Sequence, residues 1–291
     1  MKRFLILFLF SAFALYGCAP RAASSDVLTS TTFLADMTRN VAGNRLTVEA
    51  LLPIGADPHS YQPAPQDIAK IENARLLILN GAEYERFMEP LLANNAGKVA
   101  EASSGLTPRS DPSGEHGIDP HFWLDPNMVI VYVENIRAAL TELDPAGVEV
   151  YQANAATYTA QLQELDAWIQ AQANLVPAER RLLVTNHEAL GYFAARYGFT
   201  VVGAVVPSVS GSAAPSAQEM SGLIDQIRQL NVPAIFLDAA DSDALARQIS
   251  SETGAAVVSD LHLESLTDGA PAPTYIEMMK HNATRIVEAL R

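Results

Sequence analysis

Six histidines lie along the chain, and three of them stand where a side chain can face a cleft. His59 and His121 each end an Asp-Pro-His tripeptide that follows a polar or glycine-containing loop. His187 follows one predicted strand, and Asp260 closes another. Because open sheets of parallel strands form ligand sites at the carboxyl ends of their strands, these four side chains are candidates for one shared site.

Three imidazoles and one carboxylate suit Zn²⁺, which accepts nitrogen and oxygen ligands in tetrahedral geometry. Two of the candidates precede the middle of the chain and two follow it, so we expect the site at the interface between two lobes. Four protein ligands leave no open position for a catalytic water, which favours metal binding over catalysis. Since the ligands must be deprotonated, metal capture should weaken below about pH 6.

Eight short β-rich runs alternate with helical patterns, four in each half of the chain. The predicted strands are Val27–Thr31, Leu46–Leu52, Arg75–Leu79, Lys98–Ala100, Arg181–Thr185, Thr200–Val206, Ala234–Leu237 and Ala256–Ser259. The predicted helices include Pro65–Asn73, Glu83–Leu92, Ala189–Tyr197, Ala217–Leu230 and Asp243–Thr253. This alternation predicts an α/β protein with two αβ lobes, each built on a parallel sheet with helices on both faces.

The middle of the chain predicts a different element, a long helix. From Pro145 to about Val176 no glycine follows Gly147, and the next proline is Pro177. Larger apolar residues recur at the spacing of one helix face, at Tyr151, Ala155, Tyr158, Leu162, Leu165 and Ile169. A helix of about 25 residues spans close to 40 Å. We therefore expect one rigid helix to join the lobes, with the metal site in the cleft between them.

The amino terminus reads as a targeting segment. Lys2 and Arg3 precede the apolar run Phe4–Leu15, which is too short to span a bilayer, since spanning takes about 20 residues. The run ends close to Cys18, so the segment resembles a bacterial lipoprotein signal in which this cysteine carries the lipid. The alternative is an ordinary secretory signal that is cleaved a few residues further on. Either signal places the protein in the cell envelope, on the outer face of the cytoplasmic membrane or in the periplasm.

These elements predict five segments along the chain. They are a signal peptide at 1–17, a tether at 18–25, an N-terminal lobe at 26–143, the linking helix at 144–177 and a C-terminal lobe at 178–291.

Composition excludes several classes of protein. A single cysteine among 291 residues cannot form an internal disulfide or a cysteine-based zinc site. A formal charge of −14 argues against a nucleic-acid binder, which would carry a basic surface. The hydrophobic fraction of 49% argues against disorder. We expect a globular protein, working as a monomer.

The residues around the candidate ligands resemble those of a known family, the substrate-binding proteins of metal-ion ABC transporters. The resemblance covers nearly the whole chain after the signal, and its motifs occur in the family's order. The matching motifs are Gly55–Pro63, Asp119–Pro126, Thr185–Phe193, and Ser259-Asp260 followed by Tyr275–Asn282. Shorter matches occur at Pro215–Ala217 and Val232–Phe236. The family fold, two αβ lobes joined by one long helix, agrees with the pattern described above.

Transferred residue by residue, the resemblance implies that the metal ligands are His59, His121, His187 and Asp260. In this family a histidine at the third position is associated with zinc, and a glutamate there with manganese or iron. Glu188 is adjacent to the third position, so a shift of one residue would present a carboxylate instead. The count back from the Tyr-Phe pair at 192–193 favours His187.

Other polar residues near these motifs have weaker interpretations. Asp57 and Asp125 could orient ligand imidazoles, although Asp-Pro is also a common turn element. His116 lies where zinc-specific members of the family carry a His-rich loop, but one histidine is better interpreted as an exposed loop residue. His262 is a neighbour of the site, an alternative ligand or unrelated to it. His281, in the closing helix, is interpreted as structural.

The sequence therefore predicts a non-enzymatic, extracytoplasmic binding protein that captures Zn²⁺ and presents it to the permease of an ABC transporter. A manganese- or iron-specific protein of the same family is the first alternative. A secreted zinc hydrolase with Glu188 as its base is disfavoured, because the chain lacks His-Glu-x-x-His and Gly-x-Ser-x-Gly motifs. A metal-binding adhesin or a zinc store would share every ligand.

Overall fold

The computed structural model describes residues 25–92, 97–111, 117–208 and 214–291. The predicted signal peptide, Cys18, most of the predicted tether, and His116 lie outside these residues. Among the helices of the described part, none combines the length and apolar character that a membrane span requires.

The first lobe is built on a parallel four-stranded sheet of order β2-β1-β3-β4. Its strands are β1 Val27–Thr29, β2 Val48–Ala50, β3 Leu76–Leu79 and β4 Lys98–Glu101. Its helices are α1 Thr32–Ala42, α2 Pro65–Asn73 and α3 Glu89–Leu92, the last preceded by a 3-10 turn at Arg86–Met88. All four predicted strands of this half are confirmed.

The second lobe repeats the plan, with a parallel sheet of order β10-β9-β7-β8. Its strands are β7 Leu182–Thr185, β8 Thr200–Ala204, β9 Ala234–Asp238 and β10 Ala256–Leu261. Its helices are α6 Gly191–Tyr197, α7 Ala217–Leu230, α8 Ala244–Thr253 and α9 Tyr275–Leu290. The four predicted strands are confirmed, but β10 continues two residues past its predicted end, and this extension matters at the site.

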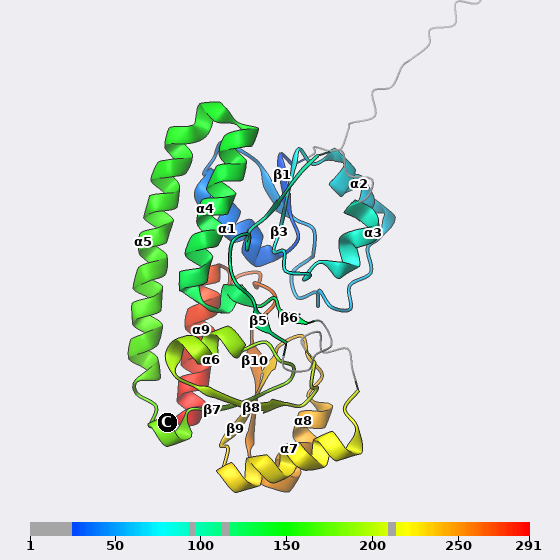
Figure 1. Cartoon of the computed structure of the whole chain (residues 1–291), viewed down its shortest axis with the longest axis vertical. Coiled ribbons are helices and arrows are strands. Elements are labelled where there is room, and N and C mark those ends of the chain that lie inside the picture. Colours follow the sequence, from blue (N-terminus) through cyan, green and yellow to red (C-terminus); the bar gives the residue numbers. More distant parts are fainter. Residues whose placement is uncertain (1–24, 93–96, 112–116, 209–213) are drawn as a thin grey trace, which may run out of the picture.

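A short antiparallel hairpin that the sequence did not predict lies between the lobes in Figure 1. It pairs β5 (Arg109–Ser110) with β6 (Ile118–Asp119). Strands of two residues are too short to show an alternating pattern. The hairpin leads through a 3-10 turn at Phe122–Leu124 into α4 (Pro126–Leu143), whose first turn is capped by the Asp125 carboxylate accepting from the Asn127 N–H.

The predicted long helix is α5, Val148–Ala173, which runs antiparallel to α4 along the side of both lobes (Figure 1). It starts after a 3-10 turn at Pro145–Gly147 and is slightly shorter than the predicted span. The six residues of the predicted apolar face are all buried. Because α5 contacts α1 of the first lobe and α6 and α9 of the second, it ties the two together.

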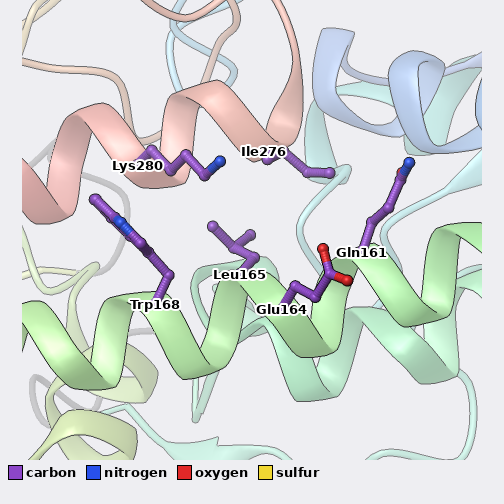
Figure 2. A pocket seen from close by; sticks show the side chains of 6 residues that line it. All are labelled: Gln161, Glu164, Leu165, Trp168, Ile276 and Lys280. Atoms are coloured by element: carbon purple, nitrogen blue, oxygen red, sulfur yellow. The ribbon is translucent and has the colours of Figure 1, made fainter.

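Figure 2 shows the contact between α5 and α9 from close by. Leu165 and Trp168 project from α5 toward Ile276 and Lys280 on α9. The Lys280 ammonium lies 6.0 Å from the centroid of the Trp168 indole, within range of a cation–π attraction. The helix that links the lobes is therefore fastened directly to the last helix of the chain.

Gly147, which precedes α5, allows a test of packing there, and Gly222 in α7 provides a control. A Cβ on Gly147 would lie 2.5 Å from Arg45 Nε and 2.6 Å from the buried Tyr151 ring, whereas a Cβ on Gly222 in α7 would meet nothing within 4 Å. We expect Gly147→Ala to lower the free energy of unfolding by about 1–3 kcal/mol through overpacking. Gly222→Ala should raise it by roughly 0.5–1 kcal/mol, because alanine favours helix. Urea unfolding of both variants checks this; equal stability of Gly147→Ala and the parent chain would contradict it.

Candidate metal site

Four side chains from four separate segments converge between the lobes: His59, His121, His187 and Glu264. One ligand atom from each lies within 4.8 Å of the other three. The Nε2 atoms of the three histidines surround a single oxygen, Glu264 Oε1, at 3.1 Å for His121, 3.3 Å for His187 and 3.7 Å for His59. A tetrahedral ion with ligands at about 2.1 Å separates them by about 3.4 Å. The cluster thus has the dimensions of a tetrahedral metal shell.

The donor atoms are withdrawn from solvent. His121, His187 and Glu264 are buried, and the His59 side chain is 11% exposed. The buried His59 Nε2 makes no hydrogen bond within the described part of the chain. A buried polar atom normally has a partner, so this nitrogen, 3.7 Å from Glu264 Oε1, is available to bind a metal ion.

Each of the first two histidines is positioned by the aspartate of its own Asp-Pro-His tripeptide, but in different ways. Asp57 Oδ1 accepts from the backbone N–H of His59 at 2.8 Å and so shapes the loop. Asp119 Oδ1 accepts from the backbone N–H of His121 at 3.0 Å and also contacts the ring Nδ1 at 2.8 Å. The carboxylate of Asp119 therefore directs His121 Nε2 into the cluster.

The segment that carries Glu264 spans the two lobes. The buried Asp238 at the end of β9 accepts from the backbone N–H groups of Leu263 and Glu264. From the first lobe, the Tyr84 hydroxyl donates to Glu264 Oε2 at 2.5 Å, and Trp123 Nε1 donates to the Leu263 carbonyl at 2.7 Å. Glu264 is therefore held from both sides, with only Oε1 directed to the three imidazoles.

The buried charges set the protonation of the cluster. Burial alone would raise the pKa of Glu264, but contacts with the three imidazoles, His121 first, hold it well below its usual range. Burial alone would lower the pKa of His121, but hydrogen bonds with Asp119 and Glu264 outweigh it and raise the value to about 10. Without metal, His121 is thus a cation between two carboxylates.

The structure does not bring Asp260, the predicted fourth ligand, into this cluster. Because β10 continues through Leu261, Asp260 lies within the strand instead of at its carboxyl end. Its half-exposed carboxylate pairs with Arg285 of α9 at 2.9 Å. Glu264, three residues beyond the true end of the strand, takes the fourth place.

The other predicted neighbours lie near the cluster without joining it. Asp125 caps α4 and contacts no cluster ring. Glu188 points into a separate pocket beside Arg109 and Asp119, where burial raises its pKa. The His262 ring packs against His281. Asp57 lines a cavity of about 40 Å³ that opens onto the cluster, together with His59, His187, Asp238, Asp241 and Glu264.

Sequence reasoning missed Glu264, Asp119 and Tyr84. A signal for Asp119 was present, because it repeats the position of Asp57 in the second tripeptide. Glu264 would have been found by applying the same strand-end rule with a longer β10. Nothing local marks Tyr84, whose partner lies 180 residues further along the chain.

Comparisons with known proteins agree with this geometry. The family model described as "Zinc-uptake complex component A periplasmic" (ZnuA) matches residues 27–289. The manganese-binding lipoprotein MntA of Halalkalibacterium halodurans is 33% identical over 94% of this chain and 91% of its own length. The iron-binding protein YfeA of Yersinia pestis is 35% identical over 92% and 86%. The periplasmic zinc-binding protein TroA of Treponema pallidum superposes with a TM-score of 0.85 at 29% identity, covering 92% of this chain and 99% of that one.

The family predicted from the sequence motifs is therefore confirmed. This chain belongs to the ZnuA family of metal-binding substrate-binding proteins of ABC transporters.

Proposed function

We propose that this protein captures Zn²⁺ outside the cytoplasmic membrane and delivers it to the permease of an ABC transporter. His59, His121, His187 and Glu264 are the proposed ligands. The observation that carries the proposal is the convergence of three imidazole nitrogens on one carboxylate oxygen.

The donor chemistry supports zinc over manganese. Imidazole suits Zn²⁺ and the later transition metals, whereas Mn²⁺ prefers carboxylate, carbonyl and water oxygens in six-coordinate sites. Glu264 offers one oxygen only, because the Tyr84 hydroxyl holds the other. The protein therefore supplies three nitrogens and one oxygen, a number and a mixture that complete a tetrahedral shell.

The relatives argue for a second candidate, a manganese- or iron-binding protein. MntA is named for manganese and YfeA for iron, and both are at least as similar in sequence as the zinc-binding TroA. Competition decides between the two candidates. Metal-free protein is equilibrated with equal concentrations of Zn²⁺, Mn²⁺ and Fe²⁺ without oxygen, and the bound metal is measured after gel filtration. Zinc in most of the protein supports the proposal; a majority of Mn²⁺ or Fe²⁺ overturns it.

Anchoring and delivery rest on separate arguments. Cys18 follows a positively charged and apolar segment, and MntA is named as a lipoprotein. We expect mass spectrometry of the membrane-bound protein to find a lipid on an amino-terminal Cys18. Growth of a deletion strain in zinc-depleted medium tests delivery, with rescue by added zinc as the expected result.

Catalysis is excluded by the family, whose members are transport binding proteins.

Tyr84 should influence which metal the site prefers, because its hydroxyl donates to the Glu264 carboxylate. Replacing it in Tyr84→Phe removes the hydroxyl from Oε2, so the carboxylate becomes free to bind a metal through both oxygens. We expect Zn²⁺ affinity to fall about tenfold, as for other partners of metal ligands, and Mn²⁺ affinity to fall less or to rise. Isothermal titration with each metal measures the ratio of the two affinities. Tyr61→Phe, which removes a hydroxyl that donates to Asp67, is the control. An unchanged ratio in Tyr84→Phe would argue against this role.

A further inference from the structure

A second pair of histidines lies outside the cluster, between β10 and α9. The ring centroids of His262 and His281 are 5.4 Å apart with an interplanar angle of 43°. In the candidate metal site the three ring pairs have centroids 5.5, 5.7 and 6.1 Å apart. Two imidazoles on one tetrahedral zinc place their centroids about 5 Å apart. The pair therefore has the spacing of two metal-bound imidazoles.

The hydrogen bonds of the pair leave a ligand atom available. His281 Nε2 lies 2.7 Å from the Asp260 carbonyl oxygen, which can only accept, so Nε2 donates to it and Nδ1 is the ring nitrogen left for a metal. Histidines that bind metals almost always donate their other ring N–H to a carbonyl or carboxylate in this way. His281 is thus oriented by the same kind of hydrogen bond that orients metal-bound histidines.

His262 is fixed in place by its backbone. Asn282 Oδ1 accepts from the His262 N–H at 2.8 Å, and Asn282 Nδ2 donates to the His262 carbonyl at 2.6 Å. Asn282 follows His281 in α9, so the helix turn that carries His281 also holds the backbone of His262. Both histidines are half-buried, which leaves a path to solvent. Beside the pair, the Arg285 guanidinium contacts two carboxylates, Asp260 and Glu288, so the nearby charge is negative, which favours a cation.

We propose that His262 and His281 form a second, weaker site for a divalent metal ion that prefers nitrogen ligands, such as Zn²⁺. Two imidazoles hold the ion, and water completes its shell. The site lies between β10 and α9, and neither histidine is a member of the four-residue cluster.

The test uses protein in which Cys18→Ser removes the thiol as a competing ligand. The protein is loaded with one equivalent of Zn²⁺, and a second equivalent is followed by isothermal titration. We expect a second binding event with an affinity at least tenfold below that of the first. His262→Asn and His281→Gln should each weaken the second event at least tenfold and leave the first unchanged. Glutamine at 281 keeps a donor for the Asp260 carbonyl, and a thermal melt confirms that each variant folds.

Two controls make the outcome decisive. His116→Asn removes another histidine and should change neither event. Ring ¹⁵N signals of His262 and His281 should shift only with the second equivalent. No second event in the parent protein, or a second event that survives both substitutions, overturns the proposal. Neither result affects the first binding event, so this inference fails separately from the proposed function.

Discussion

Glu264→Ala should abolish high-affinity metal binding, whereas Asp260→Ala should leave it unchanged. Loss of an outer partner of a ligand costs 10–100-fold in affinity, so loss of a ligand itself should cost more than about 100-fold. Glu264 Oε1 is the oxygen that all three imidazoles surround. Asp260, four residues earlier, forms a half-exposed ion pair with Arg285 on the outside of the lobe.

The two variants form a matched pair, because each removes one carboxylate from the same stretch of chain. Zinc affinity is measured by competition with a chromophoric chelator. Asp260→Ala should also cost less than about 1 kcal/mol in the free energy of unfolding, as an exposed ion pair does. If Asp260→Ala loses zinc and Glu264→Ala keeps it, the four-residue cluster is not the binding site.

The fold was predictable because its signals are local. Eight β-rich runs, each bounded by turn residues, gave all eight strands of the two parallel sheets. The α5 face from Tyr151 to Ile169 showed directly in the spacing of apolar residues. Short elements escaped prediction, since a two-residue strand such as β5 has no periodicity, and its pairing with β6 depends on contacts between distant residues.

The site was only partly predictable, for a physical reason that Asp260 illustrates. A strand end predicted two residues early puts Asp260, which lies inside β10, at the edge where we expected the ligands, so the prediction includes a carboxylate that the structure places outside the cluster. The histidines were found because each sits in a distinctive motif. The residues that position Glu264 could not be found from local patterns. The contact of Tyr84 forms only when the lobes come together, and the contact of Asp238 joins residues 26 positions apart.

Zinc binding at pH 8 should release one proton from His121. With its pKa raised to about 10 by Asp119 and Glu264, this ring carries two protons in the metal-free protein. An imidazole with an ordinary pKa of about 6.5 would be neutral at pH 8 and would have none to give. Metal must displace the proton on Nε2, while Asp119 keeps the one on Nδ1. Apparent zinc affinity should therefore rise up to about tenfold per pH unit between pH 7 and 9.

The same proton also stabilises the metal-free fold. This stabilisation decreases as pH rises, whereas the apparent zinc affinity increases. Because the folded pKa of His121 lies above its unfolded value, this contribution is complete below about pH 6.5 and is lost as pH rises toward 10. Titration of zinc in buffers of different ionisation enthalpy counts the released protons, and thermal melts of the metal-free protein follow its stability. Asp119→Asn keeps an acceptor for Nδ1 but removes a charge, so it should release less than one proton at pH 8. An observed heat that does not depend on the buffer would mean that His121 is already neutral in the metal-free protein, which would contradict this prediction.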